Sequence, residues 1–175
     1  MKNNVKQMTL CGLMTCLLIV CAQLTIALPS LVPITLQTLA VYLIGLMLKP
    51  RYALLSTLCY ILMGAIGLGV FAGMSGGIAV LAGPAGGFLF SFPIMAFVIS
   101  LIAYKSESLV TWLIALLVGT LICYGIGTIY FIYVTRSALS AALMSCVIPF
   151  LPGDALKIIV ALILNKKLKK FCTSK

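Results

Sequence analysis

The sequence contains no histidine and only two acidic residues, Glu107 and Asp154, in a chain of 175 residues. Without histidine, the chain lacks the most common metal ligand and the side chain most often used as a general base near neutral pH. Charged residues make up 8% of the chain, whereas soluble globular proteins contain about 25%. The chain contains twelve Lys and Arg residues but only those two acids. A soluble fold would therefore have almost no ion pairs and a large self-repelling charge. We therefore expect no enzymatic activity and no metal. We also expect no cofactor and no nucleic-acid partner.

Paired cysteines are also missing from the sequence. Its seven cysteines include no Cys-x-x-Cys pair, their total is odd, and most lie singly inside apolar runs. We interpret them as small apolar packing residues and not as disulfide partners or metal ligands.

Long apolar runs, in contrast, are abundant, and 63% of the residues are hydrophobic. A helix that crosses a bilayer needs about 20 largely apolar residues, and shorter ones require neighbours or membrane thinning to absorb the mismatch. We predict an all-α, polytopic membrane protein in which residues 1–175 form a single domain with six transmembrane helices. The six predicted spans are residues 8–28, 35–48, 52–68, 86–104, 109–134 and 154 to about 171.

Positive charge predicts the orientation of these spans, because Lys and Arg in short loops stay on the cytoplasmic side. The opposite side carries Arg136 alone, with Lys157 just inside the last helix. Both termini are therefore predicted to be cytoplasmic. A cleaved signal peptide is the alternative for residues 8–28, but that run exceeds the usual signal core of about 7 to 15 residues. The basic residues on the predicted cytoplasmic side are Lys2, Lys6, Lys49, Arg51, Lys105, Lys166, Lys167, Lys169 and Lys170.

Glycine and proline collect in the three predicted outward loops, at residues 29–33, 64–87 and 147–154. Non-helical backbone at membrane depth survives only where protein covers it or a cavity opens. The middle loop is too apolar for a solvated loop and too rich in glycine for a plain helix. Two interpretations stay open: glycine brings backbone close to a ligand in a pocket, or it only permits tight turns and close helix packing.

Asp154 and Lys157 are the ionisable pair on the outer side, three residues apart and thus on one face of the last helix. Ionisable groups at the centre of a membrane helix are unfavourable by about 2.5 to 3.5 kcal/mol each, so they usually mark a function. An aspartate accepts hydrogen bonds from N–H groups, and a lysine donates to a carboxylate. The alternative is that Asp154 caps the helix while Lys157 extends outward or pairs with it.

Four separated motifs resemble those of the BioY family, the biotin-specific substrate-binding (S) components of energy-coupling-factor transporters. They are LVPITLQT at residues 31–38, GAIGLGVFAGMSGG at 64–77, GPAGGF at 83–88 and PFLPGDALK at 149–157. The resemblance implies a six-helix protein of a prokaryotic cell membrane that binds biotin near the outer face. It also implies three protein partners, a transmembrane coupling protein and two ABC-type ATPases, in addition to membrane lipid. This chain has no Walker P-loop of its own.

The resemblance also implies a set of functional residues. Asp154 fits an acceptor for the ureido N–H groups of biotin, and Lys157 either binds the valerate carboxylate or balances Asp154. Gly12 and Cys16 are candidates for contact with the coupling protein, with ordinary small-residue packing as the alternative. Ala85 and Phe88 stand where the family usually has threonine and tyrosine. The implied biotin-binding residues are Asp154, Lys157, Phe71, Gly73, Ser75, Gly76, Gly77, Pro84, Gly86, Gly87 and Phe88.

Two other functions compete with biotin binding. The segment at residues 73–77 matches the G-x-S-x-G pattern of hydrolases, so Ser75 with Lys157 as base is one alternative. A self-sufficient small-molecule transporter is the other, although the lack of acidic residues within the spans argues against proton or cation coupling.

Overall fold

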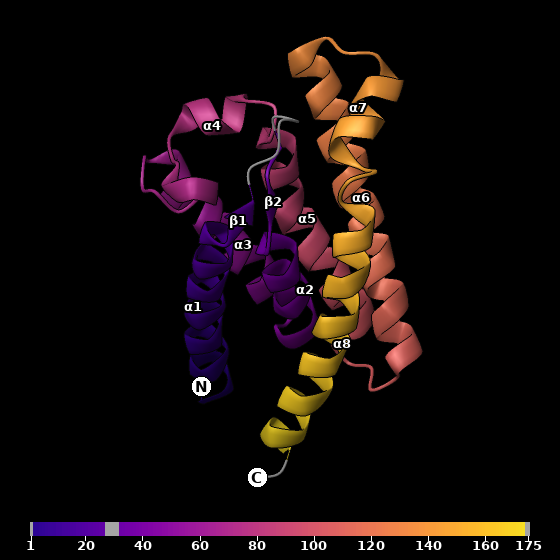
Figure 1. The fold of residues 1–175 in the computed structure, drawn as a ribbon. Helices are drawn as coiled ribbons and strands as arrows, with labels where there is room; N and C mark the ends of the chain where they lie inside the picture. Colours follow the sequence, from indigo (N-terminus) through magenta and orange to yellow (C-terminus); the bar gives the residue numbers. More distant parts are fainter. Residues whose placement is uncertain (1, 27–31, 174–175) are drawn as a thin grey trace.

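The structure is a computed structural model that describes the backbone of residues 2–26 and 32–173 and the side chains of residues 5–26 and 32–168. These residues form eight α-helices, one short 3-10 helix and a two-stranded antiparallel ribbon (Figure 1). In chain order the elements are α1 (Lys2–Gln23), β1 (Thr25–Ile26), β2 (Ile34–Thr35), α2 (Gln37–Met47), α3 (Pro50–Ala65), η1 (Ala72–Met74), α4 (Ile78–Ala82), α5 (Gly86–Ala103), α6 (Leu109–Thr135), α7 (Leu139–Cys146) and α8 (Leu151–Thr173).

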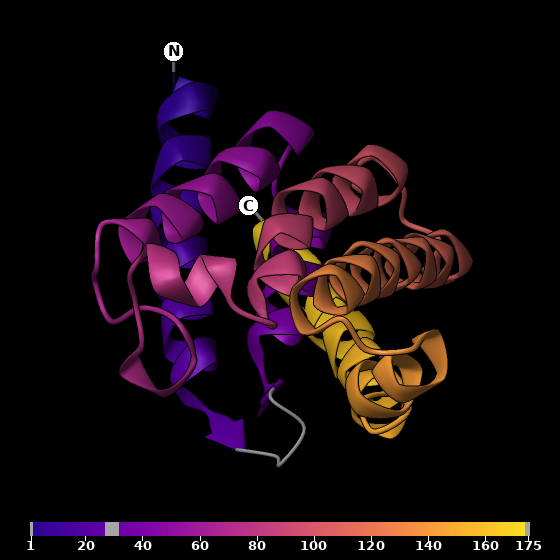
Figure 2. The same cartoon turned by 90° about the horizontal axis from the view of Figure 1, so that it is seen from above.

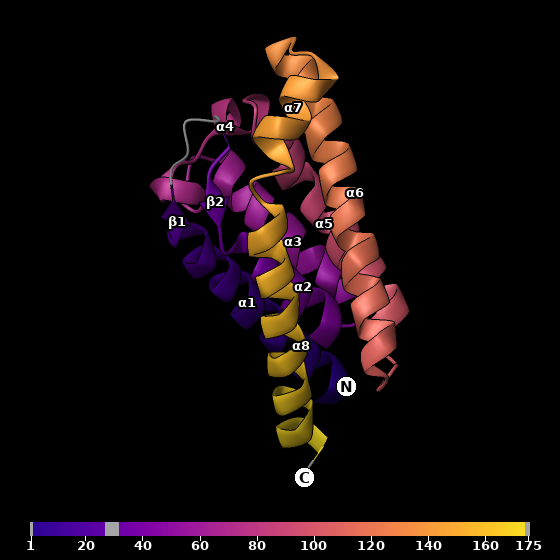
Figure 3. The ribbon, with the colours of Figure 1, turned by 45° about the vertical axis from the view of Figure 1, so that its right-hand side comes forward.

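The long helices run along a common direction, and the start of α1 and the end of α8 lie at the same end of the molecule (Figures 1 and 3). The short helices α4 and α7 lie at the opposite end. Seen from above, α5 lies among α2, α3 and α6, and it packs against all three (Figure 2).

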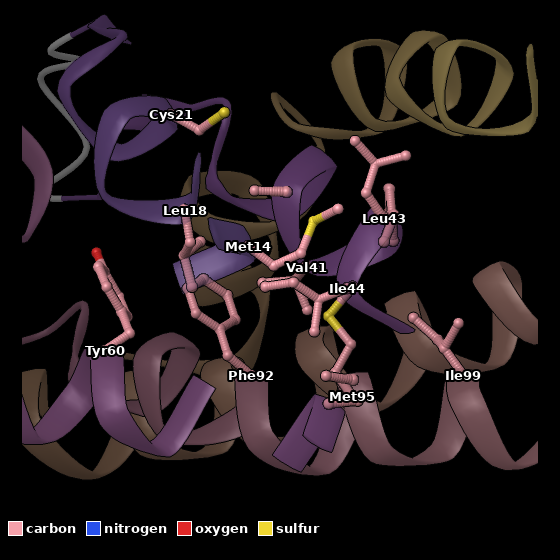
Figure 4. Close-up of a cluster of buried hydrophobic side chains, with 14 of the residues drawn as sticks. Met14, Leu18, Cys21, Val41, Leu43, Ile44, Tyr60, Phe92, Met95 and Ile99 are labelled. Carbon is pink, nitrogen blue, oxygen red and sulfur yellow. The ribbon is translucent and has the colours of Figure 1, made fainter. Parts of the chain in front are cut away.

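Helix α2 lies in the centre of the protein, and Ala40, Val41, Tyr42 and Ile44 are fully buried there. Figure 4 shows apolar side chains from α1, α2, α3 and α5 meeting around it. Gly45 lets α2 approach α5, because a Cβ atom at that position would overlap the Ile99 side chain. Interior packing therefore determines the position of α2.

The outward faces of the long helices are apolar as well. Leu13 and Val20 on α1 and Leu121 and Ile129 on α6 each expose more than half of their surface. Large apolar surfaces of this kind mark contact with lipid or with another protein. Among the described residues, three helical segments are long and apolar enough to cross a bilayer: Val5–Gln23, Gly86–Ala103 and Leu109–Thr135. A fourth crossing arises if α7 and α8, bent by 45°, form one broken span.

The sequence predicted two helices almost to the residue. The expected spans 86–104 and 109–134 correspond to α5 and α6. The prediction for the last span was wrong at its start, since α8 begins at Leu151, three residues before Asp154. The carbonyl group of Phe150 accepts a hydrogen bond from Asp154 N at 2.8 Å, so the aspartate already lies within the first turn.

The first three spans differ more from their predictions. The expected span 8–28 ends early, because α1 stops at Gln23 and β1 follows it. Residues 27–31, which include most of the predicted loop 29–33, lie outside the described part of the chain. The expected span 35–48 is the 11-residue helix α2, about 16 Å long at 1.5 Å per residue. It is shorter because Thr35 pairs with Thr25 in the ribbon. The expected span 52–68 is α3, which ends at Ala65.

Candidate functional site

A cavity of about 380 Å³ is lined by residues of η1 and α4 and of the first turns of α2, α5 and α8. Helix α4 lies at the end of the molecule opposite the chain ends (Figure 1). Small-molecule sites measure about 300–1,000 Å³ and combine apolar walls with a few polar groups. This cavity fits that description, because most of its walls are apolar and aromatic. The lining residues are Val32, Pro33, Thr35, Gln37, Thr38, Phe71, Ala72, Ser75, Ala79, Val80, Gly83, Pro84, Ala85, Phe88, Leu89, Phe92, Cys123, Tyr124, Phe150, Asp154 and Lys157.

Four polar side chains from three helices form a connected cluster on the cavity wall, which we call the carboxylate cluster. Lys157 Nζ lies 2.9 Å from Asp154 Oδ1 and donates a second hydrogen bond, at 3.0 Å, to Thr38 Oγ1. Thr38 Oγ1 in turn donates to Asp154 Oδ1 at 3.3 Å. The Tyr124 hydroxyl donates to Asp154 Oδ2 at 2.6 Å. Both oxygens of the carboxylate therefore already have donors.

The two charged members of the cluster are almost completely buried, with Asp154 4% and Lys157 7% exposed. A buried charge is tolerated only when it is paired and hydrogen-bonded. The i, i+3 spacing on α8 places the lysine against the carboxylate, and the first turn of a helix favours negative charge. The pair is neutral as a whole, yet it keeps an anionic acceptor and several donors at the edge of an apolar space.

A second polar group lies at the start of α2. Gln37 Nε2 donates to the Tyr60 hydroxyl at 2.6 Å, and the Thr35 hydroxyl donates to Gln37 Oε1 at 2.8 Å. The β1–β2 ribbon turns the chain back toward the core at this point, so Thr35 and Gln37 reach the cavity from a helix start in the interior. The Tyr60 ring meets the Phe71 ring edge-on, with the ring centroids 5.4 Å apart.

Residues 67–77, here called the wall segment, cover one side of the cavity between α3 and α4. The segment begins and ends at glycines with positive φ, Gly67 (98°) and Gly77 (94°). Both of their N–H groups donate to the carbonyl oxygen of Gly64, at 3.0 and 2.7 Å. The wall segment therefore leaves and rejoins the body of the protein at one point, and it presents Phe71 and Ser75 to the cavity.

The structure brings together six of the residues that the sequence predicted for the site. Asp154, Lys157, Phe71, Ser75, Pro84 and Phe88 all line the cavity. The Ser75 hydroxyl donates to the Ala72 carbonyl oxygen at 2.7 Å, so it stabilises the turn of the wall segment.

The five predicted glycines do not line the cavity; they shape the backbone around it. Gly73 and Gly77 have positive φ. A Cβ atom at Gly76 would meet the Leu68 carbonyl group, and one at Gly86 would meet the Leu81 carbonyl group. At Gly87 it would meet the Tyr130 side chain.

Gly12 and Cys16, predicted to contact a partner, lie elsewhere. They line an open groove of about 500 Å³ between α1 and α3, together with Cys11, Cys59 and Met63. Nothing lies within 4 Å of a Cβ atom built on Gly12, so this position faces open space. Within the described residues, no group of three or more His, Cys, Asp or Glu side chains is placed to hold a metal ion.

Comparison with known proteins places the chain in a family. The BioY family model matches residues 1–174. This chain belongs to the BioY family. A biotin transporter BioY from Thermotoga maritima is 38% identical over 168 residues, which cover 94% of this chain and 96% of that protein. A probable biotin transporter BioY from Pyrococcus horikoshii is 37% identical over 165 residues, with the same coverage of 94% and 96%.

A solved structure agrees with the BioY assignment. The crystal structure of the S-component for biotin from an ECF-type ABC transporter matches with a TM-score of 0.89 at 29% identity, over 97% of this chain and 93% of that one. These comparisons confirm the resemblance to BioY that the four sequence motifs indicated. The chain has the fold of an S-component.

Sequence reasoning missed four polar residues of this BioY cavity: Thr35, Gln37, Thr38 and Tyr124. Thr38 and Gln37 stand inside the motif LVPITLQT, and a polar pair at the start of an apolar helix was the signal that could have identified them. Tyr124 lies within the apolar run of α6, thirty residues from Asp154, and nothing in its local sequence indicates that it contacts the carboxylate.

Proposed function

We propose that this chain binds biotin in the cavity beside the carboxylate cluster and serves as the substrate-specific component of an energy-coupling-factor vitamin importer. The observation that carries the proposal is the buried, hydrogen-bonded Asp154–Lys157 pair at the edge of an apolar cavity. Biotin has a compact ureido ring with two N–H donors and one carbonyl acceptor, fused to an apolar sulfur-containing ring that carries a valerate chain. The names of this chain's relatives, biotin transporter and probable biotin transporter, point to the same ligand.

We assign the ureido ring to the carboxylate cluster. Asp154 supplies an anionic acceptor for N–H groups, while Lys157, Tyr124 and Thr38 supply donors that can turn toward the carbonyl oxygen. Lys157 is the one cationic side chain among the described residues that line the cavity, and it is paired with Asp154. Lys157 therefore balances the aspartate, and the valerate carboxylate lies away from it.

We further propose six membrane crossings, by α1, α2, α3, α5, α6 and α8, with both termini in the cytoplasm of a prokaryotic cell. Lys49 and Lys105 lie in the connections α2–α3 and α5–α6, and Arg51 lies in the first turn of α3. These elements meet on the side of the chain ends (Figure 1), which supports a cytoplasmic placement of that end. The short helix α2 is compatible with a crossing because protein surrounds most of it, and Thr35 and Gln37 at its start are buried. The cavity then opens toward the outer face, and residues 1–175 act as one domain.

The protein is a transport protein and not an enzyme, as its family and its relatives' names indicate. The hydrolase alternative has no support at Ser75, because its hydroxyl donates to a backbone carbonyl group within the wall segment. We propose that transport requires a transmembrane coupling protein and two ABC-type ATPases. The open groove beside Gly12 and Cys16 on α1 is our candidate surface for the coupling protein.

Equilibrium dialysis of the purified protein against radiolabelled biotin tests the proposed function. We expect saturable binding of one biotin per chain at submicromolar concentrations, and competition by unlabelled biotin. A matched dialysis with radiolabelled thiamine serves as the specificity control. The absence of saturable biotin binding up to micromolar concentrations would end the proposal.

A further inference from the structure

The side chain of Gln23, the last residue of α1, joins this helix to the wall segment. Its Nε2 atom lies 3.3 Å from the carbonyl oxygen of Phe71, 3.4 Å from that of Val70 and 3.5 Å from that of Gly69. Its Oε1 atom accepts a hydrogen bond from Met74 N at 2.8 Å. The same nitrogen also lies 3.3 Å from the Ile19 carbonyl oxygen within α1. An amide has two donor hydrogens and one acceptor oxygen, so Nε2 can donate to the carbonyl groups of residues 69–71 while Oε1 accepts from Met74 N.

The part of the wall segment that Gln23 contacts has an unusual backbone. Gly73 and Met74 both have positive φ, at 65° and 55°. A residue with a side chain, such as methionine, rarely adopts a positive φ unless a contact stabilises that backbone conformation. The Met74 side chain is 77% exposed and cannot supply that contact, whereas the Met74 N–H group donates to Gln23. Gln23 therefore stabilises the turn at the point where its backbone is strained.

This turn determines where two cavity-lining side chains lie. Phe71, 1% exposed, packs against Tyr60, and a Cβ atom at Gly64 would overlap its ring. Ser75 is paired with Phe71 across the turn, since Phe71 N donates to the Ser75 carbonyl oxygen at 3.0 Å. A displacement of the turn would thus move an aromatic wall and a hydroxyl group of the cavity together. Gln23 itself does not line the cavity.

We propose that Gln23 is a positioning residue for the ligand site: it holds the wall segment closed against the cavity and so limits how fast bound ligand leaves. The proposal rests on the proposed function, because the ligand in question is biotin. The segment's ends are fixed at Gly64 by two backbone hydrogen bonds. Opening therefore occurs at the free side of the turn, where the Gln23 amide makes its contacts. Losing those contacts raises the population of the open state and, with it, the dissociation rate.

The test compares Gln23→Met with Gln7→Met in the full-length protein reconstituted in nanodiscs. Methionine matches the length of glutamine without its amide. Gln7 is the matched control, because it also lies on α1 and accepts a backbone hydrogen bond, from Lys49 N at 3.3 Å, but far from the cavity. We expect radiolabelled biotin to dissociate at least about tenfold faster from Gln23→Met, as for the loss of one to two hydrogen bonds. Gln7→Met should dissociate at the wild-type rate.

Hydrogen–deuterium exchange without ligand supplies a second readout. Amides of residues 69–74 should exchange faster in Gln23→Met than in Gln7→Met, while helices α5 and α6 exchange alike. If Gln23→Met does not fold, Gln23→Asn replaces it, since that variant keeps the amide but withdraws it by one methylene. Equal dissociation rates or equal exchange of residues 69–74 in the two variants would overturn the proposal. If the wild-type protein binds no biotin, the proposed function fails, and the exchange comparison still decides whether Gln23 holds the wall segment.

Discussion

Replacing Asp154 with asparagine should separate the structural role of the carboxylate cluster from its role in binding. The substitution keeps the shape of the side chain but removes its charge. Lys157, 7% exposed, then carries an unbalanced charge, and Thr38 and the new amide oxygen are its remaining acceptors. Tyr124 donates to a neutral group or loses its acceptor.

The structure sets the size of both effects. Removing one partner of a buried ion pair lowers stability by about 3–5 kcal/mol. For a chain of this size that corresponds to a fall in Tm of roughly 6–20 °C. Losing a charge-assisted hydrogen bond to the ligand weakens binding by about 1.5–3 kcal/mol, which is roughly ten- to a hundredfold in Kd. Isothermal titration with biotin and thermal unfolding in detergent measure the two quantities.

The double variant Asp154→Asn, Lys157→Met is the control. It removes the unbalanced lysine, so we expect it to regain at least half of the lost Tm, because a neutral pair of similar volume no longer buries a lone charge. Biotin affinity should stay low, since the acceptor for the ureido N–H groups is still missing. A double variant that is no more stable than Asp154→Asn would refute the ion-pair argument. Wild-type affinity in Asp154→Asn would remove the aspartate from the site.

Three further predictions concern the same cavity. Tyr124→Phe deletes the donor to Asp154 Oδ2 and should weaken biotin binding about three- to tenfold in isothermal titration, and an unchanged Kd would contradict that role. Gly64→Ala places a methyl group where the Phe71 ring lies, so biotin binding should fall while circular dichroism shows the same helix content. Unimpaired binding would contradict this prediction, because it would show that the Phe71 ring can move without loss of affinity. Biotin methyl ester should bind less than about tenfold more weakly than biotin, because Lys157 is committed to Asp154; a hundredfold loss would place the carboxylate on the lysine.

The sequence predicted the helices that hydropathy alone determines. Helices α5 and α6 are long and apolar; a segment rich in glycine precedes α5, and polar residues follow each helix, so their ends were predicted within one residue. Helix α2 was predicted too long, because its start depends on the pairing of Thr35 with Thr25 in the ribbon. The pairing of two strands of two residues each leaves no periodic signal in a single sequence.

The same distinction holds for the candidate site. Asp154 and Lys157 were identifiable because charges are rare in this chain and the i, i+3 spacing places them together. Tyr124 and Gln23 were not, because each acts on a segment at least thirty residues away: Tyr124 on the Asp154 carboxylate and Gln23 on the wall segment. Their roles follow only from the packing of α6 against α8 and of α1 against η1.

The most direct test of the account is the sidedness of biotin binding. The protein alone is placed in right-side-out and inside-out membrane vesicles, and retention of radiolabelled biotin is measured before and after permeabilisation with detergent. We predict retention by right-side-out vesicles at once and by inside-out vesicles only after permeabilisation. Retention by sealed inside-out vesicles, with none by right-side-out vesicles, would contradict a cavity that opens to the outer face.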